Sequence, residues 1–215
     1  MNTPNLAHAL RHPHSTFHLV ASVLLVALTT MPALAAGKAP RSPLSESDTK
    51  AVLASVEAHR AVTAETALAI WGFAEVGYQE RQSSALLQKV LADAGFTVTA
   101  GVAGIPTAFV AEFKQGNGGS TIGMLGEFDA LPGFSQAATP VRTPLKGRIS
   151  GHACGHHLFG AGSASAAIAI AQSLKASGTA GTLRFYGTPA EEGGAGKVYM
   201  ARAGLFKDVD VVIHW

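Results

Sequence analysis

The sequence is poor in cysteine, in charged residues and in aromatic residues. Of its 215 residues, charged side chains make up 14% and aromatic side chains 7%, and Cys154 is the one cysteine. A single cysteine excludes an intramolecular disulfide. The formal net charge is only +2, and no block of Lys and Arg exceeds two residues, so the sequence predicts no nucleic-acid partner.

Apolar residues, by contrast, make up 47% of the chain, which is too many for a largely disordered protein and enough for a substantial core. Glycine is also abundant, at 24 residues. This combination favours an α/β protein with many tight turns between strands and helices.

The first 35 residues contain no Asp or Glu, and Arg11 is their only Lys or Arg. An apolar run at residues 19–28 is followed by Ala33-Leu-Ala35. A run of this length is too short to span about 30 Å of hydrocarbon. We therefore predict a signal peptide over residues 1–35, a periplasmic or secreted protein, and no stable membrane span after signal removal. An uncleaved anchor is the open alternative.

The rest of the chain divides into a proline-containing linker at residues 36–47 and a domain at residues 48–215. Apolar periodicity predicts one long or two short helices up to about residue 75 and a further helix at 82–94. The small residues at 160–176 predict a buried helix packed close against a sheet, and a short helix is expected at 196–203. Apolar periodicity also predicts strands at 96–99, 107–113, 121–126, 182–186 and 209–213, with a long loop at 127–158. This order predicts a layered α/β domain.

Histidines flank the lone cysteine in the segment Gly151-His-Ala-Cys-Gly-His-His157. A thiol and an imidazole separated by one glycine can converge on one metal ion from a loop, because glycine permits the turn that this requires. We therefore favour a metal-binding loop that contains Cys154 and His156. A buried cysteine beside a polar turn is the open alternative.

Polar side chains also follow three of the expected strands. Glu191 and Glu192 follow the strand at 182–186, His214 follows the strand at 209–213, and Glu127-Phe-Asp129 follows the strand at 121–126. Ligands of open α/β sheets bind beyond the carboxyl ends of the strands. If these strands run parallel, their ends share one crevice.

Two other catalytic motifs are not fulfilled. The segment that ends in Gly196-Lys197 resembles a phosphate-binding loop, but Glu191 stands where its first glycine is needed and Val198 where Ser or Thr is needed. The sequence also contains no Gly-x-Ser-x-Gly motif, which disfavours a serine hydrolase of that type.

Four segments, taken in order, resemble metallopeptidase family twenty in its amidohydrolase branch. They are Gly126-Glu-Phe-Asp-Ala-Leu-Pro-Gly133, His152-Ala-Cys-Gly-His156, Pro189-Ala-Glu-Glu-Gly-Gly194 and the strand that ends at His214. The resemblance covers about residues 48–215. Within that branch, Trp71-Gly-Phe-Ala-Glu75 and the Leu-Pro-Gly133 ending look most like the p-aminobenzoyl-glutamate hydrolases.

The resemblance implies a layered α/β/α catalytic domain of the zinc-exopeptidase type. It also implies two divalent metal ions, zinc or manganese, with a set of protein ligands and a general base. The implied ligands are Cys154, His156, Glu192 and His214, the implied base is Glu191, and Asp129 is implied to orient the site. His157 departs from the family, which usually has Asp or Asn at that position.

The family continues beyond the strand that ends at His214. An inserted lid or dimerisation domain follows, through which the full-length members form homodimers or heterodimers, and then one more metal-binding histidine. The resemblance therefore implies that residues 48–215 are a truncated catalytic domain that lacks this lid, and that this portion alone is inactive.

The implied activity is that of an exported metal-dependent amidohydrolase. Its small-molecule substrate would be an N-acyl amino acid or dipeptide-like amide of the p-aminobenzoyl-glutamate type, attacked by metal-activated water after Glu191 takes a proton. One alternative is a catalytically incompetent, metal-binding fragment of such an enzyme. Another is a structural zinc domain, which would need a closed site of four protein ligands.

Overall fold

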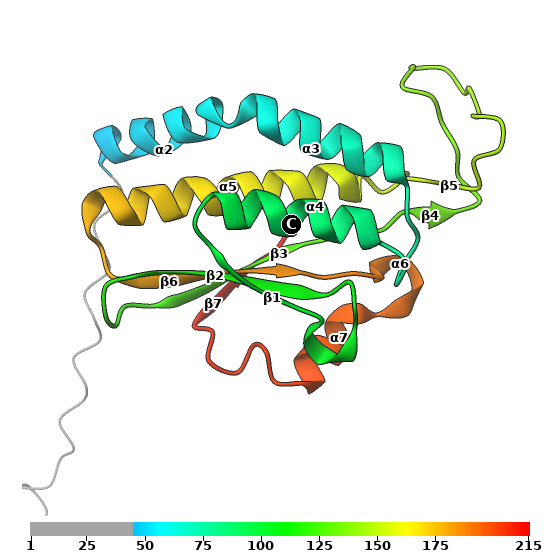
Figure 1. The fold of residues 1–215 in the computed structure, drawn as a ribbon. Coiled ribbons are helices and arrows are strands. Elements are labelled where there is room, and N and C mark those ends of the chain that lie inside the picture. The colour runs from blue at the N-terminus through cyan, green and yellow to red at the C-terminus, as the bar shows by residue number, and fades with distance from the viewer. Residues whose placement is uncertain (1–44) are drawn as a thin grey trace, which may run out of the picture. The chain divides into compact units, whose positions relative to one another are not determined.

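The computed structural model describes residues 45–215 (Figure 1). The predicted signal peptide and all but the last residues of the predicted linker lie outside this range. In the described part of the chain, no helix has the length and apolar character needed to cross a membrane.

A five-stranded sheet lies at the centre of the domain, with the strand order β1-β2-β6-β3-β7. β3 pairs in parallel with both β6 and β7, whereas β2 is antiparallel to β1 and β6. The carboxyl ends of β3, β6 and β7 therefore lie at the same edge of the sheet, which meets the condition for a shared crevice. The strands are β1 (Thr97–Ala100), β2 (Phe109–Gln115), β3 (Thr121–Gly126), β6 (Gly181–Gly187) and β7 (Val211–Ile213).

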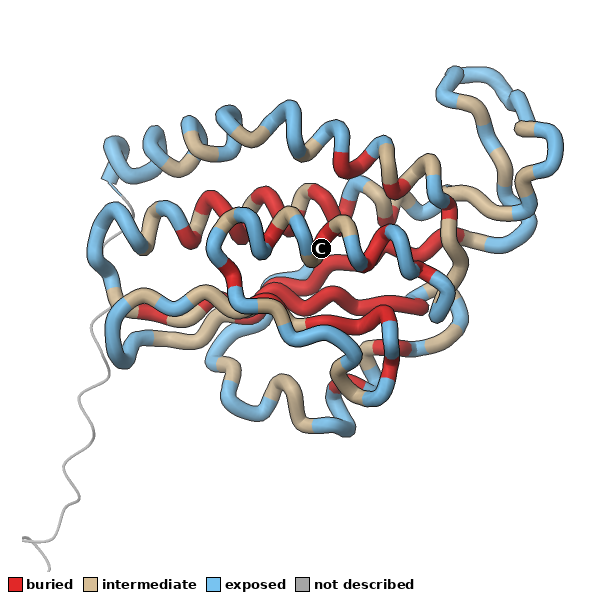
Figure 2. The backbone as a smooth tube through the Cα atoms, in the orientation of Figure 1, coloured by how far each residue is buried: buried red, intermediate tan, exposed pale blue. Residues whose placement is uncertain are grey.

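Helices cover both faces of this sheet, so the predicted layered α/β architecture is confirmed (Figure 1). One face carries α2 (Glu46–Ala58), α3 (Arg60–Phe73), α4 (Arg81–Asp93) and α5 (His156–Ser177). The other face carries the short helix α7 (Gly196–Arg202) and the 3-10 turn η1 (Val102–Gly104). Figure 2 shows that the buried residues concentrate in α5 and in the central strands.

Small residues allow α5 to lie close to the sheet. Ala164, Ala167 and Ala171 are buried in the main core. At Gly160, an added Cβ would lie 2.6 Å from the carbonyl oxygen of Glu127, so the first turn of α5 can approach the end of β3 only with glycine at this position. The helix predicted from the small residues at 160–176 is therefore confirmed as a buried helix.

The structure differs from the sequence prediction mainly around the loops. α5 begins at His156, four residues before the predicted start. Gly155, which follows Cys154, takes a left-handed backbone conformation (φ 83°) and is the N-cap of the helix. The predicted loop at 127–158 contains a two-stranded sheet of β4 (Leu131–Pro132) and β5 (Ser150–Gly151). The short helix α6 (Glu191–Gly194) was not predicted.

Candidate metal and active site

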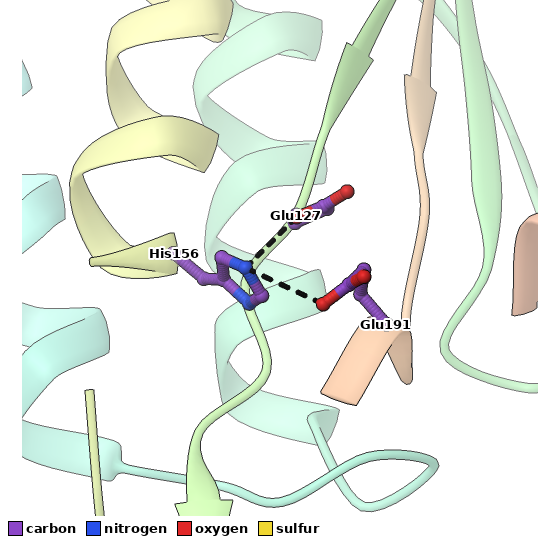
Figure 3. A group of neighbouring side chains, drawn as sticks. All are labelled: Glu127, His156 and Glu191. Carbon is purple, nitrogen blue, oxygen red and sulfur yellow. Dashed lines mark ion pairs between the residues drawn. The ribbon is translucent and has the colours of Figure 1, made fainter. Parts of the chain in front are cut away.

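Three residues from different parts of the chain converge at the carboxyl ends of β3 and β6 (Figure 3). Glu127 follows β3, Glu191 begins α6 after β6, and His156 begins α5. Each offers one ligand atom, and these atoms all lie within 4.8 Å of one another. Among the described residues, this is the group that could hold a metal ion.

His156 lies at the centre of the site and contacts carboxylates through both ring nitrogens. Its Nε2 lies 2.8 Å from Glu127 Oε2, and its Nδ1 lies 2.9 Å from Asp129 Oδ1. Nε2 also lies 3.8 Å from Glu191, and Nδ1 lies 3.8 Å from Glu192. Burial opposes protonation of the ring, but the hydrogen bonds to Asp129 and Glu127 outweigh it and raise the pKa of His156 to about 10.

Glu127 is buried and surrounded by positive or hydrogen-donating groups. Besides His156, it pairs with the ammonium group of Lys197, and its Oε1 lies 3.1 Å from His214 Nε2. Burial favours the protonated carboxyl, but these hydrogen bonds are stronger and lower the pKa of Glu127 to about 2. Glu127 is therefore a charged oxygen donor over the whole physiological pH range.

A buried carboxylate fixes the backbone that carries Glu191. Ala190, the preceding residue, has a left-handed conformation (φ 58°), and its N–H donates to Glu80 Oε1 at 2.8 Å. Glu80 is fully buried, and its Oε2 accepts from the Thr107 hydroxyl at 2.9 Å. Burial raises the pKa of Glu80. Glu80 thus connects the start of α4, the turn before β2 and the turn before α6.

Asp129 connects the same turn to His156. It is buried, and its Oδ2 accepts from the backbone N–H of Glu192 at 2.9 Å, while its Oδ1 faces His156 Nδ1. One carboxylate thus orients both a candidate ligand ring and the acidic turn. The orienting role implied for Asp129 by the family resemblance stays a prediction.

Cys154 is exposed and lies beside Glu192. The hydrogen bond between its thiol and the Glu192 carboxylate is the main cause that raises the pKa of Cys154 to about 11. The neighbouring carboxylates therefore keep the thiol protonated in the absence of a cation. A bound metal ion would reverse this preference, because coordination deprotonates a thiol.

The structure brings the residues predicted from the sequence to one edge of the sheet. His156, Glu192, His214, Asp129 and Glu191 are all linked by the contacts above, and Cys154 joins them through Glu192. The three-residue group contains Glu191 but not Glu192, His214 or Cys154. The division of roles between the two adjacent glutamates therefore stays a prediction, as do the ligand roles of His214 and Cys154.

Glu127 was expected at the shared strand ends but was given no ligand or catalytic role, although it contacts His156, His214 and Lys197. Its signal in the sequence was its place directly after a strand, in the same segment as Asp129. Glu80 was also missed, because nothing in its sequence context distinguishes it from an ordinary glutamate at a helix start.

The donor set fits a divalent cation. Glutamate oxygens and histidine nitrogens bind zinc, and the same groups also suit manganese. Around His156 lie four carboxylates, of Glu127, Asp129, Glu191 and Glu192, so negative charge exceeds the positive charge that the nearby side chains supply. A metal ion would balance this charge.

Comparisons with known proteins agree with this geometry. Residues 123–215 match the model of Peptidase family M20/M25/M40. Over 162 residues, the chain is 44% identical to one of the subunits of the p-aminobenzoyl-glutamate hydrolase of Escherichia coli, an alignment that covers 75% of this chain and 33% of the relative. The chain thus spans about a third of the length of the curated relatives that it matches.

Solved structures show the same fold. A putative aminohydrolase from methicillin-resistant Staphylococcus aureus superposes with a TM-score of 0.65 at 22% identity, over 77% of this chain and 41% of the other. The YxeP protein of Bacillus subtilis, a dinuclear metal-binding peptidase, superposes with a TM-score of 0.58 at 25% identity, over 73% and 42%. The predicted zinc-exopeptidase-like catalytic fold is therefore confirmed.

Proposed function

The chain belongs to peptidase family M20/M25/M40 through its residues 123–215, and on this premise we propose that it carries the metal-binding and general-base part of an exported amidohydrolase. The observation that supports this most strongly is the convergence of Glu127, His156 and Glu191 at the shared ends of parallel strands. The bond to be cleaved would be the amide of an N-acyl amino acid.

In this proposal, two divalent metal ions, zinc or manganese, would be held by Cys154, His156, Glu192 and His214, with Glu127 beside them. When bound, such ions acidify a water molecule and polarise the scissile carbonyl. The thiol and imidazole donors favour zinc, whereas the carboxylates also suit manganese.

Glu191 is the proposed general base. Its side chain is 42% exposed, so it can reach a substrate in the crevice, and it begins the turn that Glu80 holds through Ala190. It would accept a proton from the attacking water and then donate it to the leaving amine. Such proton transfer typically contributes about 10²- to 10⁴-fold to the rate.

Asp129 orients His156 in this scheme. By accepting from Nδ1, it directs Nε2 toward Glu127 and Glu191. A carboxylate that holds the second nitrogen of a ligand histidine fixes the ring and increases its basicity, and its removal typically costs 10- to 100-fold in metal affinity or activity.

The proposed substrate is of the p-aminobenzoyl-glutamate type, since a hydrolase named for that substrate has a subunit that is 44% identical to this chain. The proposal of export rests on the apolar run at residues 19–28 and on Ala33-Leu-Ala35. Mass spectrometry of the exported protein should find a first residue of Ala36 or Gly37. Retention of Met1 would contradict the signal peptide.

A segment exchange tests the proposed chemistry. Residues 48–215 would replace the matched segment of the E. coli hydrolase, and cleavage of p-aminobenzoyl-glutamate would be measured with zinc or manganese. We expect metal-dependent cleavage that Glu191→Gln lowers by about 10²-fold or more, with metal content unchanged. Equal rates for Glu191→Gln would remove this residue from the mechanism, and metal binding without any cleavage would favour a binding fragment.

A further inference from the structure

Lys197 places a positive charge directly against a buried carboxylate of the candidate metal site. Its ammonium group pairs with Glu127 Oε1, and the Glu127 side chain is only 5% exposed. Lys197 is the second residue of α7, which lies on the face of the sheet opposite to α5 (Figure 1). Glu127 is therefore contacted by His156 from α5 and by Lys197 from α7. The proposed ligands and general base leave this lysine without a role.

Two close contacts hold the start of α7, and with it the base of the Lys197 side chain. Met200, three residues further along the helix, is fully buried. Gly196 is buried too, and a Cβ added there would overlap the carbonyl oxygen of Pro189. The helix can begin against this segment only with glycine at that position. The backbone of α7 therefore directs the lysine toward the ends of the strands.

The ammonium group and the candidate ligand His214 share one oxygen of Glu127. His214 Nε2 lies 3.1 Å from Glu127 Oε1, which is the oxygen that pairs with Lys197. The other oxygen, Oε2, lies 2.8 Å from His156 Nε2. A cation held by Glu127 and His214 would therefore lie close to the ammonium group of Lys197.

Two cations cannot approach this carboxylate together without a cost in free energy. Like charges repel, and the repulsion near a buried group is stronger than in water because the effective dielectric constant is lower. Lys197 can withdraw, since its side chain is 30% exposed and its four-carbon stem is flexible. A divalent cation that binds at Glu127 would therefore displace the ammonium group toward solvent.

We propose that Lys197 is an internal counter-ion of the candidate metal site and competes with the divalent cation for Glu127. Before a cation binds, the ammonium group compensates part of the negative charge of the carboxylates around His156. A bound cation replaces it, and the cost of breaking the pair between Lys197 and Glu127 weakens cation binding. Lys197 thereby keeps the cation exchangeable. This inference rests on the proposed function, because it concerns the same metal site.

The zinc affinity of Lys197→Met tests the competition. The metal-free chain would be titrated by calorimetry at about 0.15 M salt, where remote charges are screened. Methionine keeps much of the apolar stem without the charge, so we expect the affinity to rise about tenfold or more. Lys197→Arg keeps the charge and should stay within about threefold of the wild type. Lys207→Met, the same change at an exposed lysine, should leave the affinity unchanged.

Thermal unfolding in EDTA tests the counter-ion without any metal. Lys197→Met leaves the buried Glu127 carboxylate without its ammonium partner, so the unfolding midpoint should fall by about 2–4 °C. In a Glu127→Gln background the partner charge is already gone, and the same substitution should lower the midpoint much less. Equal shifts in the two backgrounds would overturn the counter-ion role.

The direction of the affinity change separates the possible outcomes. If the wild type binds zinc and Lys197→Met binds it with the same affinity, the competition is wrong and the proposed function stands. A lower affinity of Lys197→Met would also overturn the proposal, because Lys197 would then support the ligands. If neither chain binds zinc or manganese, the competition and the proposed metal-dependent function are both wrong.

Discussion

Replacement of Glu80 tests how the acidic turn is held in place. The carboxylate is fully buried and accepts from the Ala190 N–H and the Thr107 hydroxyl. Glu80→Ala leaves both donors buried without an acceptor, at about 1–3 kcal/mol each. Together with the lost side-chain volume, we expect the free energy of unfolding to fall by about 3–5 kcal/mol.

Glu80→Gln keeps the shape of the side chain. Its amide oxygen can accept from Ala190 N–H while its NH₂ group donates to the Thr107 hydroxyl oxygen, which has free lone pairs. We therefore expect a loss of about 1 kcal/mol near pH 4. Urea unfolding of the two variants and the wild type measures these differences, with the exposed Glu65→Gln as a control.

The pH dependence has a defined sign. Burial raises the pKa of Glu80 above its ordinary value of 4.5, so the folded chain binds this proton more tightly than the unfolded chain. The stabilisation that this bound proton contributes is fully present below the pKa of Glu80 in the unfolded chain. It is lost as the pH rises through the pKa of Glu80 in the folded chain. Glutamine cannot titrate, so the wild-type advantage over Glu80→Gln should shrink from pH 4 to pH 7.

A wild-type advantage that grows with pH would show that the folded state favours the charged carboxylate of Glu80, and it would refute this reasoning.

Zinc affinity provides the functional readout. Glu80→Ala should weaken it about tenfold or more by releasing the turn that carries Glu191, while Glu80→Gln should preserve it. Equal zinc affinity of Glu80→Ala and the wild type would show that Glu80 does not position the site.

Two further predictions concern packing and the thiol. Gly187→Ala would place a Cβ 2.1 Å from the buried Phe109 ring, so we expect the free energy of unfolding to fall by about 1–3 kcal/mol. Gly162 lies in a helix, and an added Cβ there would have no other atom within 4 Å. Gly162→Ala should therefore stabilise the chain by up to about 1 kcal/mol in thermal unfolding. Without metal, a pKa near 11 should make iodoacetamide alkylation of Cys154 slow at pH 8, and Glu192→Gln should accelerate it. An unchanged rate would show that Glu192 does not hold the thiol proton.

The layers of the fold were predictable because apolar periodicity reports directly on burial. The small residues of α5 predicted a helix against the sheet, and the structure adds that Ser45 Oγ caps the start of α2 by accepting from the Asp48 N–H at 3.1 Å. The strands and helices therefore lie within a few residues of their predicted positions.

The loops were less predictable, because their conformations depend on distant contacts. α6 forms after a left-handed Ala190 that Glu80 holds from 110 residues away in the chain. No local pattern encodes that contact. β4 and β5 are two residues each, which is too short for an alternating pattern to appear.

The site was predicted in its location but not in all its members. Cys154 and His156 stood out by their spacing, and Glu191 and His214 by their place after strands. Glu127 also follows a strand, but its importance depends on the parallel pairing of β3 with β6, which places its carboxylate 2.8 Å from His156. Only the three-dimensional structure provides that contact.

Titration of the metal-free chain with zinc and with manganese tests the central claim most directly. We expect binding that His156→Ala weakens at least 10- to 100-fold, because the imidazole contacts every carboxylate of the cluster. His59→Ala is the matched control, since His59 lies in the turn between α2 and α3 and should leave the affinity unchanged. Failure of the wild-type chain to bind either cation, or equal affinity in His156→Ala, would contradict the assignment of this cluster as a metal site.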